Sequence, residues 1–188
     1  MDIGKIRGLD SKPIEIGDAT PMFEFVERNR AFFQNWIPFV SKTKDLKAME
    51  TTIERYLARR KGGEAMFYCL WDGPIMVAFI LAREIDEEAK WAEIGYMIDE
   101  AYQRRGIVKE ACVQLIRQLW QERRMEKIVI CCNDENVASI GLAESLGFVL
   151  EGKLRRHIAV NGNISDMRCY GLFRDEARFG EISTAERT

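Results

Sequence analysis

Residues 103–108 read QRRGIV and place two cations and a glycine at the start of a helical pattern. Arg104 and Arg105 can supply cations to phosphate oxygens, and Gly106 lets the backbone approach a ligand closely because it has no Cβ. The first turn of a helix leaves backbone N–H groups unpaired, and the helix dipole adds about half a positive charge there. Together these properties predict a phosphate-binding turn.

The elements on either side of this turn must position it. Residues 93–98 (EIGYMI) are rich in β-branched and aromatic side chains and predict a buried strand. From Ile107 to about residue 124, apolar side chains recur at helical spacing, which predicts an amphipathic helix. A strand, a basic glycine turn and a helix in this order form the arrangement that a phosphate site requires.

Composition narrows the class of protein. The chain has 188 residues, of which 47% are hydrophobic and 31% charged, as expected for one globular domain with a substantial core. A net charge of −2 provides no general basic surface for nucleic acid. No apolar run is long enough to cross a bilayer, so we expect a cytoplasmic protein without a membrane partner. Five cysteines without a CxxC pair and a single histidine predict buried free thiols and no metal site.

The remaining chain predicts further elements by its periodicity and turn residues. We expect one domain over residues 12–173, with an N-terminal extension at 1–11 and a frayed polar tail at 174–188. The acidic segment 84–88 is predicted to be a solvated connection. Strands are predicted at 14–16, 65–71, 75–82, up to 98, at 127–132, 154–160 and 164–173, and helices from Asp18 to about 36–38, at 45–61, 107–124 and 136–146. The order β-α-α-β-β-β-α-β-α-β-β predicts an α/β (α+β) fold with a mixed sheet.

This order of elements, the turn at 103–106 and the block 133–139 (NDENVAS) followed by LGF at 146–148 resemble the GNAT superfamily of acetyl-CoA-dependent N-acetyltransferases. The resemblance covers residues 12–173. Within the superfamily the chain is most similar to the RimJ/RimL branch, the ribosomal-protein N-terminal acetyltransferases. That similarity rests on Asn29-Arg30 before WIPF at 36–39, on the Asn136-x-x-Ser139 pair, and on Glu151-Gly152 before a hairpin that turns at Asn161-Gly162.

The resemblance implies a role for each matching position. Asn136 is implied to bond the pantetheine arm of coenzyme A, and Ser139 to face the sulfur and protonate the leaving thiolate. The strand through Met97 and Ile98 is implied to pair with the pantetheine and to polarise the thioester carbonyl. A substrate amine is implied to attack directly, without a covalent enzyme intermediate. The pyrophosphate is implied to bind the backbone N–H groups of Arg104, Arg105, Gly106, Ile107 and Val108.

The chain departs from the family pattern at three positions. Val108 stands where relatives usually have glycine or alanine, and Ala143 stands where many have a tyrosine acid. Ile158 stands where RimL-like enzymes use a glutamate base, with His157 beside it. The general base is therefore open between Glu93, early in the strand before the turn, and His157. A third alternative is that the amine arrives deprotonated.

The leading hypothesis for the function is acetylation of the N-terminal α-amine of a protein, such as a ribosomal protein. An α-amine has a pKa near 7.7–8.0 and lysine one near 10.4, so an enzyme without a strong base acetylates an N-terminus more easily. One alternative acceptor is a small amine, such as a polyamine, an amino sugar or an antibiotic. Another alternative is a non-catalytic module that only binds coenzyme A. A homodimer through the terminal strands is also possible.

Overall fold

The computed structural model describes residues 3–160 and 162–179. Its centre is a mixed sheet in the order β1-β2-β3-β4-β5-β7-β6, in which β4 and β5 are parallel and all other neighbours antiparallel. The predicted fold class is confirmed. The strands are β1 Asp10–Pro13, β2 Met66–Asp72, β3 Ile75–Asp86, β4 Trp91–Ile98, β5 Lys127–Asn133, β6 Val149–Val160 and β7 Asn163–Phe173. The helices are α1 Ala19–Arg28, α2 Arg30–Phe33, α3 Leu46–Lys61, α4 Ile107–Glu122 and α5 Val137–Ser145.

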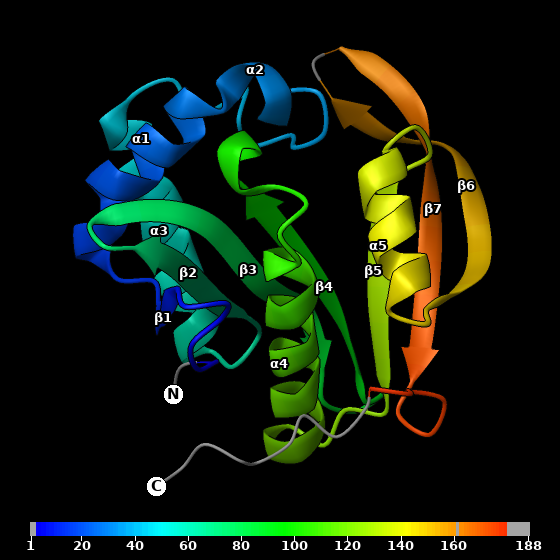
Figure 1. Cartoon of the computed structure of the whole chain (residues 1–188). Coiled ribbons are helices and arrows are strands. Elements are labelled where there is room, and N and C mark those ends of the chain that lie inside the picture. The colour runs from blue at the N-terminus through cyan, green and yellow to red at the C-terminus, as the bar shows by residue number, and fades with distance from the viewer. Residues whose placement is uncertain (1–2, 161, 180–188) are drawn as a thin grey trace, which may run out of the picture.

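Two apolar cores lie on the two faces of the sheet, because successive side chains of a strand point to opposite faces. On one face, α4 and α5 pack over residues such as Ile80 and Ile94. On the other face, α1 and α3 pack over residues such as Phe79 and Met97. Figure 1 shows α4 and α5 lying side by side in front of β4 and β5.

The parallel strands β4 and β5 pair over a short stretch only. Trp91, Ala92 and Glu93 are opposite Lys127, Ile128 and Val129, and no pairing continues beyond them. Figure 1 shows the two strands together near their first residues and separating toward their ends. Among the described residues, the second half of β4 therefore keeps β3 as its only strand partner. This separation opens the sheet beside the turn that precedes α4.

Local signals determine the helices that the sequence predicted well. Asp45 begins α3 by accepting a 2.8 Å hydrogen bond from the Ala48 amide, and Gly63 follows its end at φ +77°. Asn136 begins α5 by accepting a 3.1 Å bond from the Ser139 amide, and Gly147 follows at φ +87°. Both helices therefore begin at a side-chain N-cap and end before a left-handed glycine, signals that can be recognised in the local sequence.

The predicted strand at 14–16 is wrong, because the first strand occupies Asp10–Pro13 and pairs with β2. Ile14 instead is fully buried beneath the helices of the second face. Ile3, Ile6 and Leu9, within the expected N-terminal extension, are also buried and belong to the core of the α4 face. Their apolar contacts hold the N-terminal segment against the domain.

The predicted first helix is also wrong in length, because it ends at Arg28 and not near 36–38. The short helix α2 begins one residue after Asn29, which is buried at the break. The Asn29 side chain donates to the Phe25 carbonyl and accepts a 3.0 Å bond from the Glu100 amide. These hydrogen bonds pair the buried Asn29 side chain at the point where the helix is interrupted.

Three further boundaries differ from the prediction. The acidic segment 84–88 is not wholly a connection, since β3 continues to Asp86 and pairs there with Trp91. The last hairpin begins at Val149 rather than at 154, and of its predicted turn Gly162 is described while Asn161 lies outside the described residues. The tail is not frayed over 174–179, because Phe179 stacks on Trp120 with ring centroids 5.6 Å apart. In the part of the chain that the structure describes, no helix has the length and apolar character needed to span a membrane.

Candidate functional site

The site is a cavity of about 770 Å³ that passes through the opening between β4 and β5. At one end it is lined by the turn before α4, and at the other by α2 and the aromatic segment after it. The middle is lined by the second half of β4, the end of β5 and the first turn of α5. The cavity thus joins the predicted phosphate turn to both faces of the sheet.

The turn before α4 has the backbone of an anion site. Arg104 and Gly106 have left-handed conformations, with φ of +61° and +74°, and Gly106 is the N-cap of α4. No side chain in the described part of the chain caps this helix start, so its first N–H groups are available to an anion. Arg104 and Lys109 line the cavity beside the turn and add two cations. The left-handed conformation of Arg104 is costly for a residue with a Cβ and is typical of functional loops.

Arg105 does not belong to the cavity wall. Its guanidinium donates a 2.6 Å bond to the Ala101 carbonyl and lies over the Tyr102 ring, 4.7 Å from the centroid. A different arginine, Arg7, reaches the turn from the N-terminal segment. Its Nε is 2.7 Å from Glu110 of α4, and its guanidinium lies 3.3 Å from the position that a Cβ on Gly106 would take. No local pattern predicts this contact, because 103 residues separate Arg7 and Glu110.

The strand and helix residues predicted for the pantetheine arm come together. Met97, Ile98, Asn136 and Ser139 all line the cavity. The Asn136 side chain accepts the Ser139 amide bond that caps α5, so the two residues are fixed in position relative to each other. Ile107 and Val108 line the cavity as well, and the Val108 side chain packs against the core without closing the wall.

The two candidate bases are not part of the cavity wall. Glu93 accepts a 2.6 Å hydrogen bond from Arg83, and Arg83 rather than Glu93 lines the cavity. His157 is exposed on β6, where the pairing with β7 is irregular, and the neighbouring Ile158 lines the cavity. Among the described residues, no aspartate or glutamate lines this cavity.

The far end of the cavity is aromatic and cationic. Tyr56 stacks on Phe67 with centroids 4.4 Å apart, and both line the wall with Trp36. Burial raises the pKa of Tyr56 to about 12, although nearby Arg55, Arg83 and Arg59 lower it. Arg59 and Arg83 both line this end. A ligand with an apolar body fits this wall, because both guanidinium groups are already paired with glutamate carboxylates.

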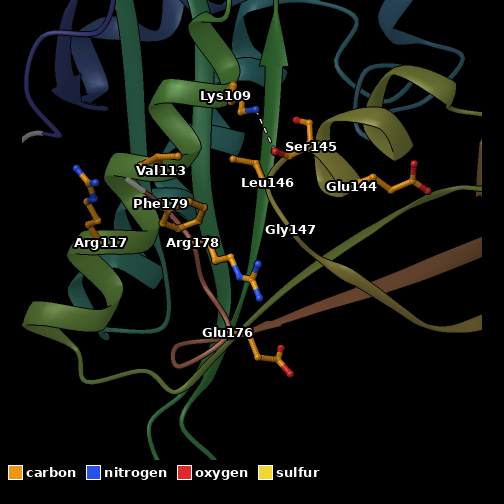
Figure 2. A pocket seen from close by; sticks show the side chains of 10 residues that line it. All are labelled: Lys109, Val113, Arg117, Glu144, Ser145, Leu146, Gly147, Glu176, Arg178 and Phe179. Atoms are coloured by element: carbon orange, nitrogen blue, oxygen red, sulfur yellow. Dashed lines mark hydrogen bonds between the residues drawn. The ribbon is translucent and has the colours of Figure 1, made fainter. Parts of the chain in front are cut away.

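A second hollow, of about 500 Å³, lies between α4, the end of α5 and the segment 174–179 (Figure 2). Lys109 lines both hollows and donates a 3.0 Å bond to the Ser145 carbonyl, which ties the start of α4 to the end of α5. Glu144, Glu176 and Arg178 give this hollow mixed charge. In the described part of the chain, no group of three or more histidine, cysteine or acidic side chains is placed to hold a metal.

The family follows from comparison with known proteins. The model of the acetyltransferase (GNAT) domain matches residues 11–149. The chain belongs to the GNAT acetyltransferase family. It is therefore an acyltransferase enzyme, and the predicted resemblance is confirmed at the level of family and fold.

The chain is also similar to individual GNAT proteins over most of its length. The putative ribosomal N-acetyltransferase YdaF of Bacillus subtilis (strain 168) is 30% identical over 167 residues, 87% of this chain and 90% of that protein. The ribosomal-protein-serine acetyltransferase of Escherichia coli (strain K12) is 28% identical over 158 residues, 82% of this chain and 87% of its own. A structure of RimL, a ribosomal L7/L12 alpha-N-protein acetyltransferase in complex with coenzyme A, superposes with a TM-score of 0.88 at 22% identity, over 94% of this chain and 99% of that one.

Proposed function

We propose that this GNAT enzyme transfers the acetyl group of acetyl-CoA to the N-terminal α-amine of a protein, such as a ribosomal protein. The observation that carries the proposal is the continuous cavity between β4 and β5, with a cationic helix start at one end and aromatic side chains at the other. Relatives described as ribosomal-protein acetyltransferases support the class of acceptor. A structural neighbour described as a complex with coenzyme A supports the donor.

The residues at the turn fit a pyrophosphate. The uncapped N–H groups at the start of α4 and the side chains of Arg104 and Lys109 would hold it, as anion sites at helix N-termini do. The backbone of Met97 and Ile98 has no strand partner on the β5 side and would pair with the pantetheine arm. Acetyl-CoA supplies an acetyl group activated as a thioester.

Three groups would act on the acetyl transfer. A backbone N–H of β4 near Met97 would polarise the carbonyl, and loss of such a donor typically costs about 3–4 kcal/mol of transition-state stabilisation. Asn136 would orient the pantetheine, and Ser139 would be the source of the proton that the leaving sulfur receives. Each of these residues lines the cavity.

The cavity favours an α-amine over a polyamine. No carboxylate of the described residues lines it, so no acidic side chain of its wall is placed to pair with a second positive charge on the acceptor. An α-amine is also easier to present in its neutral form than a lysine, by about 2.5 pKa units or about 3.5 kcal/mol. We therefore infer that the amine attacks as the neutral base, with Glu93 and His157 outside direct contact with it.

Binding and acceptor assays test this proposal together. Acetyl-CoA at about 100-fold over its dissociation constant should stabilise a two-state domain by about 2.7 kcal/mol. S-acetylpantetheine, which lacks the phosphates and the nucleotide, should stabilise it less. With acetyl-CoA present, peptides with a free α-amine should be acetylated faster than spermidine or an amino sugar. Absence of a thermal shift would contradict the donor, and faster acetylation of spermidine would contradict the acceptor.

A further inference from the structure

The hydroxyl of Tyr96 is buried and has no hydrogen-bond partner among the described residues. The other two buried side-chain atoms without a partner in that part of the chain are the indole nitrogens of Trp71 and Trp120. Only Tyr96 of these three residues lines the cavity between β4 and β5. Folded proteins seldom leave a buried hydroxyl unpaired, because its hydration is lost without compensation. A ligand in the cavity is therefore the natural partner of this hydroxyl.

The surroundings of Tyr96 make it a donor. Burial raises its pKa well above the ordinary value, and the thiols of Cys112 and Cys132 act in the same direction. The nearby Ser139 hydroxyl lowers the Tyr96 pKa, but its effect is smaller than that of burial. Tyr96 consequently stays protonated over the pH range in which amines are acetylated, and a neutral phenol beside an acceptor donates its O–H.

We propose that Tyr96 donates its hydroxyl proton to the sulfur of coenzyme A as the acetyl group leaves, with Ser139 returning a proton to Tyr96. The inference rests on the proposed function and adds a catalytic residue to it. Tyr96 is on β4 and Ser139 on the first turn of α5, so the two hydroxyls approach the cavity from elements on either side of the opened sheet.

The proton transfers balance without an external base. The lone pair of the amine nitrogen forms a bond to the acetyl carbon, and the electrons of the carbon–sulfur bond pass to sulfur. Tyr96 gives its proton to that sulfur. Ser139 gives its proton to the Tyr96 oxygen and takes one from the new amide nitrogen. The products are an acetamide and a thiol, and both hydroxyls are restored, which is consistent with a wall that has no carboxylate among the described residues.

Tyr96→Phe tests the proposal, because it removes the hydroxyl and keeps the ring. The matched control is Tyr68→Phe, which removes a buried hydroxyl bonded to Gln118 at 2.9 Å, outside the cavity wall. One readout is the pKa of the thiol of bound coenzyme A, followed by the ultraviolet absorbance of the thiolate. The other is steady-state acetylation of the best peptide acceptor.

We expect Tyr96→Phe to raise the pKa of the bound thiol by about one unit, because a hydrogen bond to the thiolate is lost. We expect kcat to fall by about 10- to 100-fold, with KM for acetyl-CoA changed less than about threefold. Tyr68→Phe should leave the thiol pKa and kcat unchanged.

Two results would overturn the role of Tyr96. One is a bound-thiol pKa and kcat equal to those of the wild type. The other is a raised KM with an unchanged kcat, which would make Tyr96 a binding contact only. Failure of the proposed function is distinguishable, since it appears in the wild type itself as absence of coenzyme A binding or of any acetylated amine. In that case the role of Tyr96 is overturned with it.

Discussion

Asn29 and Asp99 are joined by a 3.1 Å hydrogen bond from Asn29 Nδ2 to Asp99 Oδ2, although 70 residues separate them. Asp99 directly follows β4, and it also accepts a 2.7 Å bond from Arg28 at the end of α1. Both Asn29 and Asp99 are buried. The bonds attach the break between α1 and α2 to the end of β4, the strand that leads into the turn before α4.

Replacing Asp99 by asparagine should destabilise the fold at neutral pH. Burial raises the pKa of Asp99, but the bonds from Arg28, Asn29 and the Ala101 amide outweigh it and hold the pKa below its ordinary value. The stabilisation is therefore present above the unfolded pKa near 3.9 and is lost as the pH falls through the lower folded pKa. We expect Asp99→Asn to lower the free energy of unfolding at pH 7 by about 1–3 kcal/mol, the usual worth of hydrogen bonds to a charged group.

Urea denaturation at pH 7 and in acid measures this effect. The difference between wild type and Asp99→Asn should narrow below about pH 4 as the native carboxylate is protonated. Asp10→Asn is a suitable control, because its 3.2 Å pair with Lys5 is largely exposed and contributes little. Equal stabilities at pH 7, or a difference that persists in acid, would contradict the prediction.

Substitutions of Ser139 and Asn136 should have different effects on kcat and on the affinity for acetyl-CoA. Ser139→Ala keeps the cap of α5, because the donor to Asn136 is the backbone amide. We expect its kcat to fall by about 100-fold with little change in affinity for acetyl-CoA, as for loss of a proton donor. Asn136→Ala removes the cap, so it should weaken affinity for acetyl-CoA and lower the free energy of unfolding by about 1 kcal/mol. Isothermal titration with coenzyme A and steady-state kinetics distinguish the two, and unchanged turnover in Ser139→Ala would remove it as an acid.

The pH–rate profile of Glu93→Gln tests the candidate base. Because Glu93 is bonded to Arg83 and does not line the cavity, we expect its acidic limb to coincide with that of the wild type. The limb should follow the peptide α-amine, with an apparent pKa near 7.7–8.0. His157→Ala serves as the matched comparison, since His157 is exposed. Loss of the acidic limb in either variant would identify that residue as the base.

Phe179 should contribute to stability although it lies close to the C-terminus of the chain. Its ring stacks on Trp120 of α4 and packs against the core of that face. We expect Phe179→Ala to lower the free energy of unfolding by about 1–2 kcal/mol, from the lost aromatic pair and buried area. Phe173→Ala, at a side chain that is 42% exposed, is the control. Denaturation midpoints that agree for wild type and Phe179→Ala would show that the segment is dispensable.

The parts of the fold that the sequence predicted are those with local causes. The cap at Asp45 and the glycines after α3 lie within a few residues of the helix that they delimit, and so does Asn136 at the start of α5. The break at Asn29 depends on Asp99, which is distant in the sequence. The order of β4, the glycine turn and α4 was predicted for the same local reason.

Site residues missed by sequence reasoning have long-range causes. Arg7 reaches Gly106 only because Ile3, Ile6 and Leu9 anchor the N-terminal segment in the core. The strand pattern predicts Tyr96 as a core residue, and its unpaired hydroxyl is evident only from the three-dimensional structure. Arg105 is the opposite case: it was predicted to supply a cation to phosphate oxygens, but its guanidinium donates to the Ala101 carbonyl.

Mass spectrometry can locate the amine that this enzyme acetylates. The wild-type enzyme is incubated with acetyl-CoA and a peptide that carries both a free α-amine and an internal lysine, and the acetylated position is located by fragmentation. We expect one added acetyl group, on the α-amine, and no product when acetyl-CoA is omitted. Acetylation of the lysine in preference to the α-amine, or no acetylated product from any amine, would contradict it.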